Sequence, residues 1–539
     1  MVSKIGNSLE SYEKVTPQTI DLPNLLSLFF SIVQNKSFVV AIPVLVTWTH
    51  LLRSEAITSK ANNLIAPLLQ LCSARLIRYE EFPDSGQLED PSMALLFEDI
   101  DTQPERHAFL GNFRRYNVAV IEQIVRRRTT DAVYHILSQV WQTLEHLYEN
   151  VPPFSIENYS TRSIAVLSVD GQFTVVEAAL KGFLRSRDSA KNKDQEFEGQ
   201  KKMEDDFQGW CERLMSLKFD DPLIKRRVIQ LVVQFATSAL DKRPEFMFKV
   251  LEHILMARPV DPPEPKNTEN RYTAAVKEMK ADAMAELQKL GSKMPDQLLP
   301  IYDDLEAKIN SIIAAGGVDE RQQLSYRTFL FVIIHRAKGI DRDVRIARLR
   351  AFIDPVTQLW QNPALSSALQ SFSGFMEILG MGKVNDYLVS RQVHNIEDWG
   401  SFVLDVEGLA IQTELQERIK ALPLRPTKAF LGSSTEKVSK ESETCEIACS
   451  MWADSIPVML PDLLKYLEHA HAFNNPSNWA GLPQEMQGIV PRILTDRFWQ
   501  AGISGGSKDD FFARVSDTKT TMEGLASSIR GTVRAVREA

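Results

Sequence analysis

Apolar residues recur along most of this chain at the spacing of an amphipathic helix. Segments of helix length carry them at i, i+3, i+4 and i+7, whereas the short alternating patterns typical of strands are scarce. The clearest segment covers residues 220–257. Asp221 followed by Pro222 is a helix start, "DKR" at 241–243 predicts a turn, and Pro244 starts a second helix. The pattern predicts an all-α protein in which this segment forms two antiparallel helices.

Each helix of this pair has one apolar face that has to be buried. The predicted buried positions are Ile224, Val228, Leu231, Val232, Phe235 and Ala239 in the first helix, and Met247, Val250, Leu251, Ile254 and Leu255 in the second. Similar pairs are predicted at 38–78, 105–149, 298–337, 342–379 and 457–499. Their spacing is close to the roughly 40–47 residues of HEAT or armadillo repeats.

A single helical pair cannot bury both of its apolar faces, but a stack of neighbouring pairs can. The spacing therefore predicts a HEAT-like helical-repeat solenoid, an α-α superhelix of the armadillo type. It is favoured over a four-helix bundle and over a set of unrelated helical domains. Polar segments at 186–206, 258–270 and 431–443 are predicted to be exposed loops between helices. None is long enough for a domain linker, so residues 1–539 are predicted to form one solenoid domain.

Composition narrows the class of protein. The chain has 539 residues, of which 44% are apolar and 24% charged, which is the balance of a folded soluble protein. The formal net charge of −8 excludes a general polycation, so any basic site must be local. Four scattered cysteines are too few for a disulfide framework and favour a reducing compartment. The longest apolar run, at 38–46, is shorter than the roughly 18 residues of a membrane span, so no membrane insertion is expected.

Several segments occur in the order and context of one known family. They are "IPVLVTWTHLLRSE" at 42–55, "LFEDIDTQPERHAFLGNFRR" at 96–115, "DDPLIKRRV" at 220–228, "DKRPEFM" at 241–247 and "DPVTQLWQNPALSSALQSFSGFMEILG" at 354–380. On these segments the chain resembles exportin-5, of the importin-β (karyopherin-β) superfamily. The resembling residues are packing and turn residues, so they indicate lineage rather than chemistry.

The resemblance implies a nuclear export receptor that shuttles between nucleus and cytoplasm. It implies binding of RNA or protein cargo together with RanGTP, and contacts with the FG-repeat proteins of the nuclear pore. The RNA cargo would be structured or double-stranded, such as small RNA precursors or tRNA. The chain resembles the middle and C-terminal part of the family, so the N-terminal arch that grips Ran is expected to be missing.

Candidate catalytic and metal-binding motifs are weak. "GISGG" at 502–506 satisfies G-x-S-x-G with Ser504 as the nucleophile, but the preceding segment is predicted to be helical rather than a strand. Cys445 and Cys449 share one helical face but have no nearby histidine to complete a zinc site, so they are interpreted as buried thiols. His469 and His471 are interpreted as ordinary helix-end residues. The expectation is a non-enzyme without cofactor or metal.

Local basic clusters are the candidate binding residues. The candidates for RNA or cargo are Arg126, Arg127, Arg128, Lys225, Arg226, Arg227, Arg342 and Arg345. The alternative interpretation is that these residues only interact with helix ends or form ordinary ion pairs at the surface. Arg336, Lys338, Arg348 and Arg350 surround the same helix-turn-helix joint as the last two. If stacking brings these clusters onto one concave surface, they would contact phosphates, and a duplex would be recognised by shape rather than by sequence.

Two other classes of function remain open. One is a HEAT-repeat scaffold that assembles a cytoplasmic complex without transport, and it differs from an exportin in whether RanGTP enhances cargo binding. The other is an α/β hydrolase built on Ser504, which would require a parallel sheet that the pattern does not predict.

Overall fold

The computed structural model describes residues 4, 6, 9, 21–78, 90–149, 153–157, 159–161, 163–191, 199–260, 271–316, 318–473, 475–479, 482–495 and 518–538. Across these residues every regular element is a helix, and one isolated antiparallel bridge joins Val403 to Thr521. The prediction of an all-α protein is confirmed. The described residues divide into two compact units, of which unit 1 ends at Glu286 and unit 2 begins at Leu287. The single continuous solenoid over 1–539 stays a prediction.

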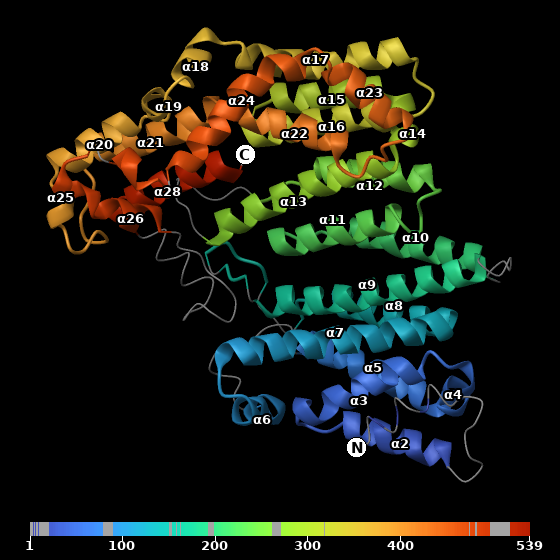
Figure 1. The fold of residues 1–539 in the computed structure, drawn as a ribbon. Coiled ribbons are helices and arrows are strands. Elements are labelled where there is room, and N and C mark those ends of the chain that lie inside the picture. Colours follow the sequence, from blue (N-terminus) through green and yellow to red (C-terminus); the bar gives the residue numbers. More distant parts are fainter. Residues whose placement is uncertain are drawn as a thin grey trace. The chain divides into compact units, whose positions relative to one another are not determined.

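Unit 1 is a stack of helices in which α9 packs against α7, α8 and α11, and Figure 1 shows α7, α9 and α11 side by side. Its helices are α2 (Leu22–Val33), α3 (Phe38–Leu51), α4 (Glu55–Lys60), α5 (Asn62–Arg78), α6 (Pro91–Asp99), α7 (Gln103–Arg127), α8 (Thr129–Glu145), α9 (Ile164–Lys191), α10 (Gln200–Ser216), α11 (Pro222–Ala236) and α12 (Pro244–Met256), and α13 (Arg271–Lys293) begins in it.

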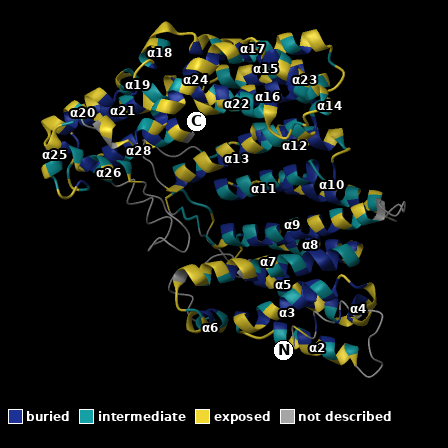
Figure 2. Ribbon diagram, in the orientation of Figure 1, coloured by how far each residue is buried: buried dark blue, intermediate teal, exposed yellow. Residues whose placement is uncertain are grey.

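The helical pair predicted at 220–257 is present as α11 and α12. The Asp221 carboxylate caps α11 by accepting hydrogen bonds from the backbone N–H groups of Leu223 and Ile224, at 2.8 and 3.4 Å. The predicted apolar positions of both helices are buried, except that Leu255 is half-buried. In Figure 2 buried residues alternate with half-buried ones along α11, whereas α12 also has exposed residues. The 3.6-residue period therefore located the faces that pack.

The crossing of α7 and α9 is unusually close. A Cβ atom added at Gly182 of α9 would lie 2.7 Å from both the Glu122 carbonyl oxygen and the Val125 Cβ of α7. Only glycine at this position lets the two helices approach without displacing backbone.

Unit 2 contains the remaining helices, which are α14 (Pro295–Leu298), η2 (Leu299–Ile301), α15 (Tyr302–Ala314), α16 (Glu320–Arg336), α17 (Arg342–Trp360), α18 (Pro363–Ala368), α19 (Phe372–Ile378), α20 (Met381–Ser390), η3 (Val393–Asn395), α21 (Val406–Ala421), α22 (Leu424–Thr435), α23 (Glu443–Trp452), α24 (Ser455–Ala472), η4 (Pro476–Trp479), α25 (Gln484–Gln487), α26 (Ile489–Leu494) and α28 (Met522–Glu538). Three aromatic rings, from Phe331, Phe352 and Phe430, join α16, α17 and α22, with ring centroids 5.1–5.9 Å apart.

The last described helix, α28, packs against α21 from much earlier in the chain. The Gln412 side chain on α21 donates hydrogen bonds to the Lys519 carbonyl and to the Ser528 hydroxyl, across 107 and 116 residues of sequence. The Tyr466 hydroxyl of α24 donates to the Val536 carbonyl at 3.0 Å. These contacts tie the end of α28 into unit 2.

Several predicted boundaries are wrong. α9 continues to Lys191 and α10 begins at Gln200, so most of the predicted loop at 186–206 that is described is helical. In α10 the polar residues face solvent while Met203 and Phe207 are buried, so a polar composition concealed an amphipathic helix. α22 likewise continues to Thr435, inside the loop predicted at 431–443.

Two predicted pairs have a broken second helix. In 342–379, α17 is followed by the short α18 and α19, because Asn362 and Ser371 each cap a new helix start. In 457–499, α24 is followed by the short α25 and α26.

No single described helix is long and apolar enough to cross a membrane. One bent pair, α23 with α24, passes the same length and composition criteria together, with 72° between its helices.

Candidate functional site

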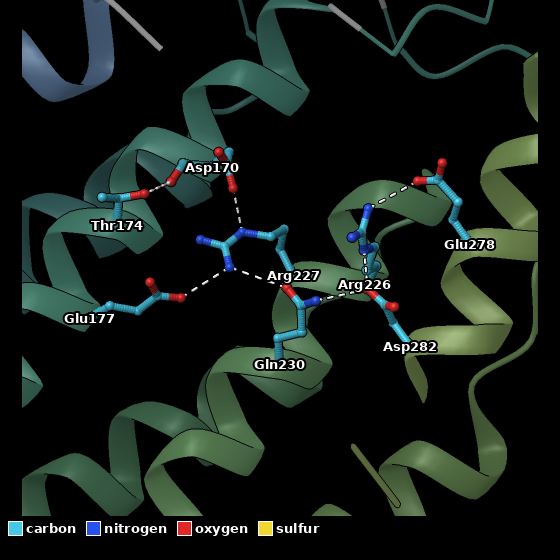
Figure 3. Close-up of polar contacts among 8 residues, drawn as sticks. All are labelled: Asp170, Thr174, Glu177, Arg226, Arg227, Gln230, Glu278 and Asp282. Carbon is cyan, nitrogen blue, oxygen red and sulfur yellow. Dashed lines mark hydrogen bonds and ion pairs between the residues drawn. The ribbon is translucent and has the colours of Figure 1, made fainter. Parts of the chain in front are cut away.

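The basic cluster of Lys225, Arg226 and Arg227 lies within a network of ion pairs that joins three helices of unit 1 (Figure 3). Arg227 of α11 contacts the carboxylates of Asp170 and Glu177 on α9, the latter at 3.0 Å. Its neighbour Arg226 contacts the carboxylates of Glu278, at 3.1 Å, and Asp282 on α13. Two successive arginines on α11 therefore reach in opposite directions, one to the helix on each side.

Gln230, one turn further along α11, connects the two halves of this network. Its side-chain amide donates to Asp282 at 2.9 Å, and its carbonyl oxygen accepts from Arg227 at 3.2 Å. The Thr174 hydroxyl donates to the backbone carbonyl of Asp170. The network thus fixes side chains on α9, α11 and α13 relative to one another.

The electrostatics of this site are acidic rather than basic. Two guanidinium groups face four carboxylates, those of Asp170, Glu177, Glu278 and Asp282. Burial disfavours the charged form of Arg227, but the carboxylates outweigh burial and raise the pKa of Arg227 above its usual value. The arrangement can hold helices together, but it repels a phosphate backbone.

Lys225 is the third member of this cluster. Its ammonium donates to the Arg258 carbonyl at 2.8 Å and lies 3.9 Å from the Asp220 carboxylate. Burial lowers the pKa of Lys225, against the opposing effect of Asp220 and Asp221. Lys225 is therefore also engaged by groups of its own chain.

The basic cluster of Arg126, Arg127 and Arg128 lies at the C-terminal end of α7, as predicted. Arg126 donates to the Ser189 hydroxyl, Arg127 to the Leu52 carbonyl and Arg128 to the Asn62 side-chain oxygen, at 3.1, 3.1 and 2.7 Å. All three partners are neutral, so the positive charges of this cluster are not cancelled by them.

The structure does not bring these two clusters together. Arg126 meets α9 at Ser189, whereas Arg227 meets it at Glu177. Twelve residues of helix separate these two positions, which is about 18 Å along the axis of α9. The two clusters therefore contact α9 at separate places and do not form one continuous basic patch along it.

The candidates of unit 2 lie at the start of α17. Arg342 is exposed and donates to the Ser450 hydroxyl at 3.0 Å. Arg345 is 2% exposed and contacts the Glu443 carboxylate at 3.4 Å. Burial lowers the pKa of the neighbouring His335 to about 4, with the positive charges of Arg336 and Arg345 adding to the effect. Arg342 is thus open to a ligand, while Arg345 is enclosed.

The other cations around this joint contact groups of their own unit. Arg336 donates to the Ser433 and Glu436 carbonyls, Arg348 contacts Asp303 at 3.8 Å, and Arg350 contacts Asp454 at 2.6 Å. The backbone N–H of Lys338 donates to Asp296.

The remaining sequence motifs gain no support as sites. Ser504 lies outside the described residues. The interpretation of Cys445 and Cys449 as buried thiols is wrong, because Cys445 is half-buried and Cys449 exposed. His469 and His471 lie in the last turn of α24, as predicted. Among the described residues no group of three or more His, Cys, Asp or Glu could hold a metal ion.

Comparison with known proteins decides the lineage. The model of the Exportin-5 family matches residues 5–539. The chain belongs to the Exportin-5 family. Among curated relatives it is 26% identical over 515 residues to Protein MSN5 of Saccharomyces cerevisiae, covering 94% of this chain and 40% of that protein. It is 25% identical over 541 residues to an uncharacterized protein of Schizosaccharomyces pombe, covering 99% of this chain and 43% of that protein.

The chain thus spans about two fifths of the length of the curated relatives it matches. With the helical stacking of both units, family membership confirms the prediction of an all-α HEAT-like solenoid. Members of the exportin family are transport receptors rather than enzymes.

The acidic half of the α9–α11–α13 network was not predicted from the sequence. A signal was present, because Asp170 and Glu177 are seven residues apart, and Glu278 and Asp282 four, so each pair lies on one helical face. Charged pairs at this spacing on neighbouring repeats are candidates to flank an intervening arginine.

Proposed function

We propose that this chain is part of a nuclear export receptor that binds RNA or protein cargo together with RanGTP and carries it through the nuclear pore. The observation that supports the proposal is the match to the Exportin-5 family over residues 5–539. The receptor would shuttle between nucleus and cytoplasm, contact FG-repeat proteins and catalyse no reaction itself.

The proposed mechanism is thermodynamic linkage between two ligands. If cargo and RanGTP both favour the same arrangement of the stacked helices, each raises the affinity for the other by the same factor. GTP hydrolysis on Ran would remove one of the two ligands and release the cargo. Within this scheme the ion-pair network of α9, α11 and α13 has a structural role, since it keeps neighbouring helices in register.

The first test is a titration of duplex RNA with and without RanGTP, on the chain and on a version extended at its N-terminus. We expect RanGTP to raise the RNA affinity of the extended version by roughly 5–150-fold, the usual range of coupling between two sites. The response of the chain alone measures how much of this coupling lies within residues 1–539. RanGDP is the control.

A response that is absent in both versions would contradict the export function. It would favour the scaffold alternative, in which cargo binding does not depend on RanGTP.

Within this function we propose that duplex RNA contacts those of the eight candidate residues that are paired only with neutral side chains or carbonyls. These are Arg126, Arg127 and Arg128 at the end of α7, and Arg342 at the start of α17. A bound phosphate can replace a neutral acceptor and gain a full ion pair. Lys225, Arg226, Arg227 and Arg345 are engaged or enclosed by groups of the chain, and we propose that they act through packing.

The second test uses the salt dependence of RNA binding. Each cation that neutralises a phosphate contributes about 0.7–0.9 to the slope of log affinity against log salt. Replacing Arg126, Arg127 and Arg128 by alanine should therefore weaken duplex binding and flatten the slope by roughly two units. Sequence preference should not change, because the contacts are to phosphates.

The matched control is the triple alanine variant at Lys225, Arg226 and Arg227. It removes the same formal charge, yet its salt slope should stay that of the wild type. Equal flattening in both triple variants would contradict the assignment of roles made here and would favour one RNA track through both clusters.

A further inference from the structure

A groove of about 710 Å³ lies in unit 2, between α15, α16, α17 and α22. Its apolar lining comes mainly from α16 and α17, and comprises Leu324, Leu330, Phe352, Val356, Leu359 and Phe430. Phe352 and Phe430 belong to the aromatic cluster that joins these helices, with ring centroids 5.9 Å apart. Leu359 is 49% exposed. The lining is therefore a firm apolar surface that water still reaches.

Three arginines at this groove have no partner for their side chains among the described residues. They are Arg321 and Arg327 of α16 and Arg425 of α22, and all three are exposed. This contrasts with Arg226 and Arg227 of unit 1, each of which contacts two carboxylates. The free guanidinium groups give the groove bidentate donors for carboxylates.

The two other cations of the lining, Lys420 and Arg348, each lie near a carboxylate. Lys420 contacts the Glu417 carboxylate at 2.6 Å. Arg348 lies 3.8 Å from the Asp303 carboxylate and 5.6 Å from the centre of the Tyr302 ring. Altogether five cationic and three acidic residues line the groove, whereas the chain as a whole has a net charge of −8. The groove is thus locally cationic in an acidic protein.

We propose that this groove binds an acidic amphipathic helix of a partner protein. The apolar face of that helix would pack on Phe352, Val356 and Leu359, in the way that helices bind into hydrophobic grooves. Its flanking glutamates or aspartates would pair with Arg321, Arg327 and Arg425. The proposal does not depend on the export function, since such binding requires neither Ran nor RNA.

The same features disfavour an RNA duplex as the occupant. A phosphate backbone gains nothing from an apolar floor, and it would face the carboxylates of Asp303, Glu306 and Glu320 on the groove lining. A helix with carboxylates on one flank satisfies both the apolar and the cationic parts of the lining.

The test is fluorescence anisotropy with a synthetic probe and the whole chain. The probe is a labelled peptide of about 14 residues with leucine at i, i+3, i+4 and i+7 and glutamate elsewhere, a length at which a helix is marginally stable in water. Two control probes carry glutamine in place of glutamate, or serine in place of leucine. Both should bind more weakly than the probe.

Two variants separate the contributions of charge and apolar contact. Replacing Arg321, Arg327 and Arg425 by alanine should weaken probe binding roughly tenfold, since each exposed ion pair contributes a few-fold in affinity. Leu359→Ser should weaken it about fivefold through lost apolar contact. Both changes are at exposed positions, where folding is little affected.

A matched control removes three exposed cations that do not line the groove, by alanine replacement of Lys201, Arg258 and Arg271. It should bind the probe like the wild type. Equal loss in the control triple, or no loss in the groove triple, would overturn the proposal. So would a groove triple that keeps its affinity for the probe but loses affinity for an RNA duplex of about 16 base pairs.

Discussion

Arg227→Met should lower the free energy of local unfolding around α9 and α11 by about 3 kcal/mol. Removing one partner of a largely desolvated ion pair leaves the carboxylates of Asp170 and Glu177 without a compensating positive charge. Arg227 is 20% exposed and its partners Asp170 and Glu177 are 32% and 23% exposed. Methionine retains much of the packing volume but provides no charge. Amide hydrogen exchange in α9 and α11 should accelerate roughly 100-fold.

Two controls make this result specific. In the triple variant Arg227→Met with Asp170→Asn and Glu177→Gln, much of the protection should return, because no uncompensated charge remains. Arg128→Met removes an exposed arginine whose guanidinium donates to the neutral Asn62 side chain, and it should change local stability by no more than about 0.5 kcal/mol. A similar loss in both single variants would mean that the carboxylates near Arg227 do not matter.

Gly182→Val should be at least as damaging, at about 3 kcal/mol, for a steric reason. The added Cβ would lie 2.7 Å from the Glu122 carbonyl oxygen and from the Val125 Cβ, so α7 and α9 would have to separate. The two further methyl groups of valine also restrict its rotamers in a helix. Hydrogen exchange should accelerate in both helices of the crossing.

Gly111 provides the matched control for this substitution. It lies in α7, and a Cβ added there would meet nothing within 4 Å. Gly111→Val should therefore change stability only by the difference in helix propensity, a gain of less than about 0.5 kcal/mol. If Gly182→Val were equally mild, the close crossing described above would be wrong.

Much of the fold follows from local sequence signals. Asp221, Pro222 and Pro244 mark helix starts through capping and a fixed backbone angle, and the structure has the helix starts there. The apolar period gives the buried faces because only one side of each helix touches its neighbours. The segment at 186–206 was misjudged because charge content describes the exposed face of a helix and a loop equally well.

The candidate site was less predictable, because its character depends on residues from other helices. The sequence at 225–227 is a run of three cations, but its electrostatic character is set by carboxylates about 50 residues away on either side. The free arginines of the groove, by contrast, are scattered over α16 and α22 and form no run. A charge cluster in sequence therefore does not identify a charged surface in a stacked helical fold.

The contact between α21 and α28 sets an order of events during synthesis. Unit 1 also has contacts between helices that are distant in sequence, such as that of α5 with α9. α21 has to wait for partners 107 and 116 residues further on. At about 5–20 residues per second, that delay is roughly 5–20 s. During this interval the face of α21 that later packs on α28 is exposed, so a chaperone that binds apolar surface would have a site there until α28 is synthesised.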